Sequence, residues 1–303
     1  MTTELRGEPV AEAVRESVAD RVRMMRDAGT VPTLGTVLAS DAPDAAHFMD
    51  LKHEACATAG VATRDHRLGT DASETAVVEA VEGLNEDPDV DAVFVQTPLP
   101  EGVDVSAVGP RIAPEKDVDC FHPDTLGRLV AGDPRFVPAT TAAVCRLLTH
   151  YGVTVAGAHV VVVGRSRAVG RPIANRLLWD AEPGNATVTV CHTRTSDLGA
   201  TTRRADVLVT AAGEPRLVDG SMLTPGAVVV DVSANRRPTD SGGEDGSVVG
   251  DVDAASARER AAALTPVPGG VGPVTIAALL DNVVTAAEHR ADATDRHPPE
   301  TGP

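Results

Sequence analysis

The chain has 303 residues, 42% of them hydrophobic, and a formal net charge of −17 at pH 7. This length is sufficient for two domains that each bury a core, and so negative a charge argues against nucleic acid as a partner. No apolar run approaches membrane-spanning length and the amino terminus lacks a signal-peptide pattern, so we expect no membrane association and a cytoplasmic location.

The basic residues are almost all arginine, since lysine occurs only at Lys52 and Lys116. Lysine can release its proton at moderate pH and arginine cannot, so both lysines are candidates for a chemical role; chance retention is the alternative. The acidic residues are spread along the chain, which indicates a salt-rich cytoplasm. The four cysteines are widely spaced without a CxxC pair, which predicts buried thiols and neither a metal site nor disulfides.

Hydrophobic periodicity predicts alternating helices and strands in the first half of the chain. The helices are expected at residues 10–27, 45–58 and 73–84, and the strands at 33–39, 61–67 and 90–95. Phe48 and Lys52 lie four residues apart on one helical face, which suits a planar ligand and proton transfer; a surface lysine over a core phenylalanine is the alternative. Gln96 follows a strand, where ligands bind in open α/β sheets. Residues 115–129 are predicted to form an irregular polar loop.

The second half begins with a helix at 140–151 and a buried strand that ends in four valines and Gly164. The loop of Arg165 to Val169 then leads into a helix at Gly170. Backbone N–H groups and the helix dipole at such a turn can bind a pyrophosphate, which predicts a dinucleotide. The match to G-x-G-x-x-G is imperfect, because Ser166 replaces the second glycine and one residue is added. A turn glycine and a packing glycine in an ordinary α/β domain are the alternative.

Further alternation predicts a doubly wound, largely parallel sheet. Its remaining strands are expected at 186–191, 206–211 and 227–232, with a helix at 197–204. The segment from His192 to Arg194 follows a strand where NAD-binding proteins usually place an acid, and with Arg165 it favours the 2′-phosphate of NADP. Residues 241–247 are predicted to be a mobile loop, and 290–303 a disordered tail.

Five motifs occur in the order and at the spacing seen in one enzyme family. They are VQTPLP, KDVDCFHP, GRSRAVGRP, CHTRT and TPVPGGVGPVT. With them the chain, from about residue 5 to 289, resembles the methylenetetrahydrofolate dehydrogenase/cyclohydrolase family. The resemblance implies oxidation of 5,10-methylenetetrahydrofolate by NADP, hydrolysis of the 5,10-methenyl product to 10-formyltetrahydrofolate, and a homodimer that acts in one-carbon metabolism.

The same resemblance implies a two-domain α/β fold with folate in the cleft. Residues 1–139 would form an N-terminal folate-binding catalytic domain, completed by a C-terminal helix at about 272–289. Residues 140–271 would form a Rossmann-like, doubly wound NADP-binding domain, and 290–303 a tail.

Carried over position by position, the resemblance assigns roles to individual residues. The implied catalytic residues are Lys52, Gln96 and Asp119. The implied substrate-binding residues are Phe48, Lys52, Gln96, Pro98, Leu99, Asp119, Pro268, Gly269 and Gly270. The implied cofactor-binding residues are Gly164, Arg165, Ser166, Val169, Gly170, Pro172, His192, Thr193 and Ala234. Lys116 is expected to position its loop.

The chain also departs from the family pattern. Phe48 stands where the family has tyrosine, Cys120 where it has glycine, Pro138 to Thr141 replaces PCTP, and residues 231–235 read DVSAN instead of DVGIN. Phe48 lacks a hydroxyl near Lys52, and the Cys120 side chain is expected to press on folate. Three alternatives follow: a dehydrogenase with weak or no cyclohydrolase activity, a related NADP oxidoreductase with another small substrate, and a non-catalytic folate- or nucleotide-binding protein.

Overall fold

The computed structural model describes residues 2–236 and 248–296, which form two compact units. One, here the three-stranded unit, comprises Ala13–Ala139 and Ile276–Pro303. The other, the six-stranded unit, comprises Met1–Glu12 and Thr140–Thr275. The first residues therefore belong with the second half of the chain and not, as predicted, with the N-terminal domain.

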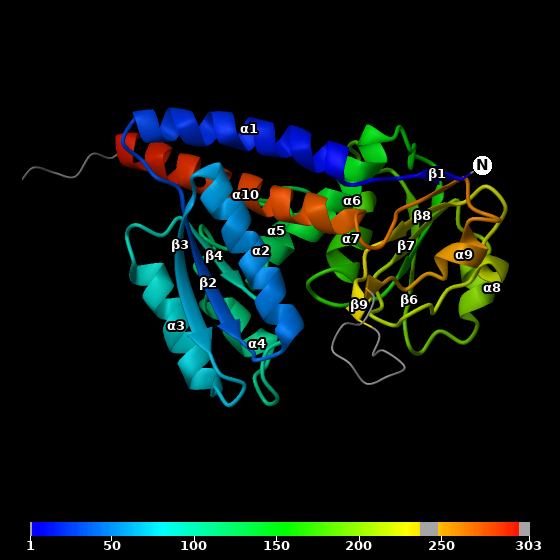
Figure 1. Cartoon of the computed structure of the whole chain (residues 1–303), viewed down its shortest axis with the longest axis horizontal. Helices are drawn as coiled ribbons and strands as arrows, with labels where there is room; N and C mark the ends of the chain where they lie inside the picture. The colour runs from blue at the N-terminus through cyan, green and yellow to red at the C-terminus, as the bar shows by residue number, and fades with distance from the viewer. Residues whose placement is uncertain (1, 237–247, 297–303) are drawn as a thin grey trace, which may run out of the picture. The chain divides into compact units, whose positions relative to one another are not determined.

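The three-stranded unit contains a parallel sheet in the order β3-β2-β4. Its strands are β2 (Thr33–Ala39), β3 (Ala62–Leu68) and β4 (Ala92–Val95). The crossover helices α2 (Pro43–Ala59) and α3 (Glu74–Glu86) cover opposite faces (Figure 1). This follows from right-handed crossovers, because the chain moves from β2 to β3 in one direction and back across to β4 in the other. Every residue of β2 is buried, so the central strand anchors the core.

Four more α-helices contribute to this unit: α1 (Glu8–Asp27), α4 (Val105–Val108), α5 (Pro123–Ala131) and α10 (Val271–Arg296), the first and last of which begin in the other unit. The prediction of an irregular polar loop at 115–129 holds for residues 115–122 and is wrong from Pro123 onward, where α5 begins. His122 caps α5 through a hydrogen bond from the Asp124 N–H, and Leu129 is fully buried. A polar composition hid this helix because its buried stripe is narrow.

The six-stranded unit contains a parallel sheet in the order β1-β11-β8-β7-β5-β6. Its strands are β1 (Thr3–Glu4), β5 (His159–Val163), β6 (Thr187–Cys191), β7 (Val207–Thr210), β8 (Val228–Asp231) and β11 (Ala263–Leu264). The helices are α6 (Ala139–His150), α7 (Gly170–Leu177), α8 (Leu198–Thr202) and α9 (Ala254–Ala257). A short antiparallel pair, β9 (Asn235–Arg236) and β10 (Val248–Val249), lies outside this sheet. The four valines of β5 are buried, as predicted.

Two predictions about the C-terminal region need correction. The tail was expected to begin at residue 290, but α10 continues to Arg296. The segment Val271–Ala293 is also long and apolar enough to cross a membrane, against the expectation that no apolar run approaches that length. More than half of it is buried within the protein, and a core helix passes the same test. The predicted mobile loop at 241–247 lies outside the described residues.

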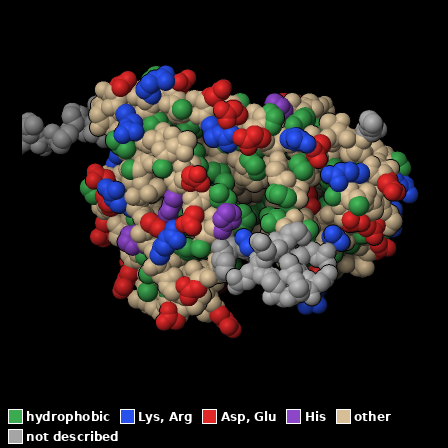
Figure 2. Space-filling view, in the orientation of Figure 1, with side chains coloured by type: hydrophobic (Ala, Val, Ile, Leu, Met, Phe, Trp, Pro, Cys, Tyr) green, Lys and Arg blue, Asp and Glu red, His purple; other side chains and the backbone are tan. Residues whose placement is uncertain are grey.

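All four cysteines are buried, as expected. Acidic and basic side chains are interspersed over the face of the molecule shown in Figure 2. The net charge of −17 is therefore not gathered in a single patch on this face.

Candidate active site and dinucleotide-binding loops

Lys52 lies on α2 with its ammonium directed toward β4. Its Nζ donates hydrogen bonds to Gln96 Oε1 at 3.0 Å and to the Phe48 carbonyl oxygen at 3.2 Å. The same atom lies 4.9 Å from the ring centroid of Phe94. Helix α2 and strand β4 thus bring Lys52, Gln96 and Phe48 together within the three-stranded unit.

Burial lowers the pKa of Lys52 to about 8, and the negative charge of Asp119 partly opposes this shift. Desolvation disfavours the charged form of an amine, whereas a nearby carboxylate favours it. A lysine with a pKa close to the ambient pH can both release and accept a proton.

Gln96 directly follows β4 and is oriented by its own neighbour. Its Nε2 donates to the Thr97 carbonyl oxygen at 2.7 Å, which leaves Oε1 to accept from Lys52. Pro98 is exposed and Leu99 is partly exposed in the segment that follows. The amide is therefore fixed as an acceptor for the ammonium.

Asp119 is held by the backbone, because its Oδ1 accepts a hydrogen bond from Ala139 N at 2.9 Å. Burial raises the pKa of Asp119 to about 7, and the charge of Asp117 adds to the shift. Asp117 is itself fully buried and accepts from the N–H groups of Phe121 and His122 and from the Thr125 hydroxyl. The segment that was predicted to be an irregular polar loop therefore carries a buried carboxylate that organises it.

Asn282 on α10 was not singled out from the sequence, yet it links the two segments that hold Asp119. Its Nδ2 donates to the carbonyl oxygens of Val118 at 2.9 Å and Val137 at 2.8 Å. No sequence pattern marks this contact, because the residues are more than a hundred positions apart.

The second lysine has a different environment. Lys116 Nζ donates to the carbonyl oxygens of Leu84, Asn85 and Asp87, where α3 ends. Such an ammonium satisfies carbonyls that lack partners at a helix end. These contacts support the expectation that Lys116 has a positioning role.

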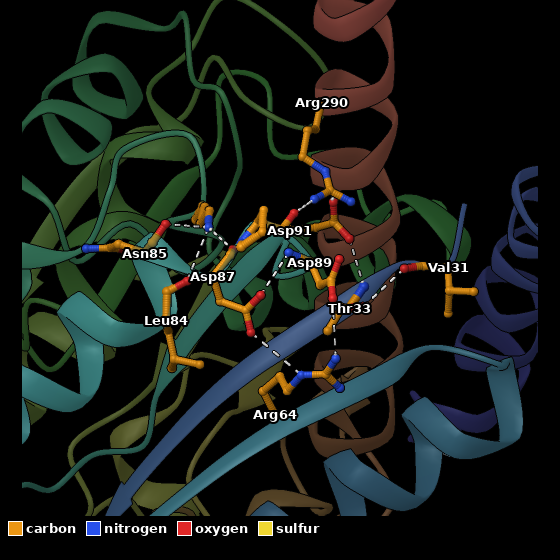
Figure 3. Close-up of polar contacts among 11 residues, drawn as sticks. Val31, Thr33, Arg64, Leu84, Asn85, Asp87, Asp89, Asp91 and Arg290 are labelled. Carbon is orange, nitrogen blue, oxygen red and sulfur yellow. Dashed lines mark hydrogen bonds and ion pairs between the residues drawn. The ribbon is translucent and has the colours of Figure 1, made fainter. Parts of the chain in front are cut away.

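Nearby, Arg290 of α10 points at Asp91, whose side chain is fully buried at the start of β4 (Figure 3). The Arg290 Nε and Asp91 Oδ1 atoms are 2.6 Å apart, and Asp91 Oδ2 accepts from Thr33 N. This ion pair attaches the last helix to the strand that leads to Gln96.

In the six-stranded unit, Gly164 follows β5 and α7 begins at Gly170. A Cβ on Gly170 would lie 2.2 Å from the Gly164 carbonyl oxygen, so only glycine allows the helix to start this close to the strand. Ser166 Oγ accepts from the N–H groups of Val169 and Gly170, so the serine that replaces the second glycine caps the turn. Pro172 is buried in α7, while Arg165 is exposed beside the turn.

The end of β6 fits a cofactor with a 2′-phosphate. The side chains of Thr193 and Arg194 are exposed, and His192 receives a hydrogen bond from the Arg194 N–H. The first acidic residue after β6 is Asp197. Its Oδ1 accepts a hydrogen bond from the Ala200 N–H at 2.7 Å and so caps α8. No carboxylate of this segment is therefore placed to hold a 2′-hydroxyl or to repel a phosphate.

Asp251 supports the loops after β7 and β8 and was also missed. It is fully buried and accepts hydrogen bonds from Ala212 N, Glu214 N, the Ser233 hydroxyl and the Asn235 amide, among others. Ala234 lies between two of these partners and is exposed. The GDVD sequence around Asp251 resembles a loop rather than a core strand, which is why it gave no signal.

Pro268, Gly269 and Gly270 belong to the six-stranded unit, whereas Lys52, Gln96 and Asp119 belong to the other. The resemblance implied that these three residues bind the substrate. In the structure, the backbone of Gly270 instead lies close to the backbone of Gly7. A Cβ on Gly7 would lie 1.9 Å from the Gly270 carbonyl oxygen. Gly7 N also donates to the Gly269 carbonyl oxygen at 2.8 Å.

Comparison with known proteins gives matches over nearly the whole chain. Two family models match: the tetrahydrofolate dehydrogenase/cyclohydrolase catalytic domain over residues 5–119, and the NAD(P)-binding domain of the same family over residues 138–291.

Bifunctional protein FolD from Haloquadratum walsbyi is 46% identical over 289 residues, 95% of this chain and 91% of that protein. FolD from Natronomonas pharaonis is also 46% identical and covers 96% of this chain and 98% of its own. The crystal structure of the Trypanosoma brucei N5,N10-methylenetetrahydrofolate dehydrogenase-cyclohydrolase complexed with NADP and inhibitor is 36% identical, with a TM-score of 0.90 over 96% of this chain and 98% of that one. This chain belongs to the tetrahydrofolate dehydrogenase/cyclohydrolase family.

Proposed function

We propose that this protein oxidises 5,10-methylenetetrahydrofolate with NADP and hydrolyses the resulting 5,10-methenyltetrahydrofolate to 10-formyltetrahydrofolate. The observation that carries the proposal is the 3.0 Å hydrogen bond between Lys52 Nζ and Gln96 Oε1, together with a Lys52 pKa of about 8, in a chain of this family. The three-stranded unit would bind the folate, and the six-stranded unit the dinucleotide.

NADP, when bound, accepts the hydride of the first step. The hydrolysis needs a group that moves protons while water adds to the one-carbon bridge. Lys52 suits this task because its Nζ is held by Gln96 and Phe48 while burial favours its neutral form. Asp119, fixed by the Ala139 N–H, is available to bind a polar edge of the folate ring.

A matched pair of variants tests the proposal, because the chain contains only two lysines. Lys52→Arg keeps the positive charge but cannot exchange a proton at neutral pH, so hydrolysis should fall at least a hundredfold. Binding of NADP should be unchanged. Lys116→Arg makes the same chemical change away from the site and should retain both activities.

The measurement is the absorbance of 5,10-methenyltetrahydrofolate, followed during its formation with NADP and during its hydrolysis. Undiminished hydrolysis by Lys52→Arg would refute the role of Lys52. A wild-type protein that binds NADP and tetrahydrofolate without turnover would instead favour the non-catalytic alternative.

A dehydrogenase with weak cyclohydrolase activity is the second candidate, and Phe48 favours it. We also propose a homodimer in a salt-rich cytoplasm that binds neither nucleic acid nor membrane. The spread of negative charge and the resemblance to FolD proteins of Haloquadratum and Natronomonas support this setting.

A further inference from the structure

Three neighbouring groups contact the ammonium of Lys52. Two of its N–H bonds go to Gln96 Oε1 and the Phe48 carbonyl oxygen. The ring of Phe94 lies near the same atom, with its centroid 4.9 Å from Nζ. A lysine ammonium has three donors and no acceptor, so an aromatic face beside it attracts the cation without competing for the acceptors.

The position of Phe94 follows from the geometry of β4. Side chains two residues apart in a strand point to the same face of the sheet, so Phe94 and Gln96 face α2 together. Phe94 is only 8% exposed and pairs in register with Thr36 of β2, which fixes the ring. A fixed aromatic face within about 6 Å of a cation attracts it electrostatically, more strongly where water is excluded.

We propose that Phe94 is a positioning residue that holds the Lys52 ammonium against Gln96 and sets how readily Lys52 gives up its proton. The inference rests on the proposed function, because it assigns a partner to the lysine of that site. Phe94 itself exchanges no proton and forms no bond with a substrate.

Among the residues that the structure describes, Asp119 and His53 are the titratable groups whose charges interact with that of Lys52. Asp119 is the carboxylate that favours its charged form. On α2, His53 is the neighbouring titratable group; its Nε2 lies 3.0 Å from the Thr36 hydroxyl, and Asp65 of β3 lies beyond it. None of these groups is altered by a change at Phe94, so a change in Lys52 titration would report the ring.

The test replaces the ring and reads Lys52 directly. In Phe94→Leu the Lys52 ammonium stays desolvated but loses the aromatic face that attracts its charge. The neutral form of Lys52 is then favoured relative to the charged form, so the pKa of Lys52 should fall by about half a unit to one unit. Phe94→Tyr keeps an aromatic face and should restore the wild-type value. Phe136→Leu removes another buried ring of the same unit and serves as the control.

Because the chain has only two lysines, protein labelled with carbon-13 at lysine Cε gives two resonances to titrate, and Lys116→Arg assigns them. This readout needs no substrate, so it decides the role of Phe94 even if the proposed function fails. If Phe94→Leu does not fold, Phe94→Met removes the ring with a smaller change in volume.

Two further readouts separate positioning from stability. The acidic limb of the pH profile for methenyltetrahydrofolate hydrolysis marks the formation of neutral Lys52, so it should move to lower pH together with the pKa of Lys52. Affinity for NADP should not change. A Lys52 titration in folded Phe94→Leu or Phe94→Met that matches wild type, or moves upward, would overturn the proposal.

Discussion

Cys120 adopts a backbone conformation that few residues other than glycine take, with a φ of +57°. This explains why the family pattern has glycine at that position, because a Cβ is strained in the left-handed region. The expectation that its side chain presses on folate is not supported: the thiol is 3% exposed and donates to the Phe136 carbonyl oxygen at 3.1 Å. The residue is directed into the protein.

Phe48 is a position at which a single substitution is expected to increase the hydrolysis activity. Its ring is 38% exposed, while its carbonyl oxygen is occupied by Lys52. Phe48→Tyr would add a hydroxyl that can join the network around the ammonium, typically worth about 0.5–1.5 kcal/mol, or roughly three- to tenfold in rate. We expect the ratio of hydrolysis to dehydrogenation to rise.

The ratio is measured by assaying both activities on the same preparations of wild type and Phe48→Tyr. Phe136→Tyr, which adds the same hydroxyl to a buried ring elsewhere, controls for a general effect. An unchanged or lower ratio in Phe48→Tyr would show that Phe94 and the surrounding loop already complete the network.

At the scale of elements, the regular parts of the fold were predictable because their periodicity is strong. Strand β2 has the predicted bounds, and β5 is buried as four consecutive valines require. Strands β1 and β11 were missed, because two residues carry no period. Helix α5 was missed because its polar face outweighs its buried one.

The candidate site was predictable only in part, for a physical reason. Lys52 was conspicuous in a chain that has replaced nearly all its lysines, and Gln96 stood at a strand end. Asp251 and Asn282 gave no signal, because their roles arise from tertiary contacts to backbone groups. Phe94 could have been found from its spacing of two residues from Gln96, which places both on one face of β4.

The end of β6 predicts the choice of cofactor. With Arg165 and Arg194 exposed and Asp197 engaged as a helix cap, NADP should bind more tightly than NAD. Arg194→Ala should weaken NADP binding about tenfold or more and leave NAD binding unchanged, since a charge-assisted contact contributes about 1.5–3 kcal/mol.

Titration calorimetry with both dinucleotides provides the measurement. Arg111→Ala removes one exposed arginine from the other unit and controls for net charge. Equal affinities of the wild type for NAD and NADP would refute the prediction.

For the whole molecule, the net charge of −17 predicts a strong dependence of stability on salt. Carboxylates that repel one another in the compact state are screened as ionic strength rises, and the Debye length is only about 3 Å at 1 M. The midpoint of thermal unfolding should therefore rise by roughly 5 °C or more between 0.1 and 2 M KCl.

Unfolding is followed by circular dichroism over a KCl series, with sucrose as a control that is excluded from the protein surface without screening charge. A midpoint that falls or stays constant with KCl would contradict the prediction, and a rise equal in sucrose would assign the effect to exclusion instead.

The pairing of β1 with β11 also determines the order in which the two sheets can form during synthesis. Thr3 is made some 260 residues before its partner Ala263. The strands β2, β3 and β4 are complete once Val95 has been made, so their local contacts can form early. Strand β1 must instead remain unpaired until β11 has been translated. The six-stranded sheet is therefore completed late, after the three-stranded sheet can already have formed.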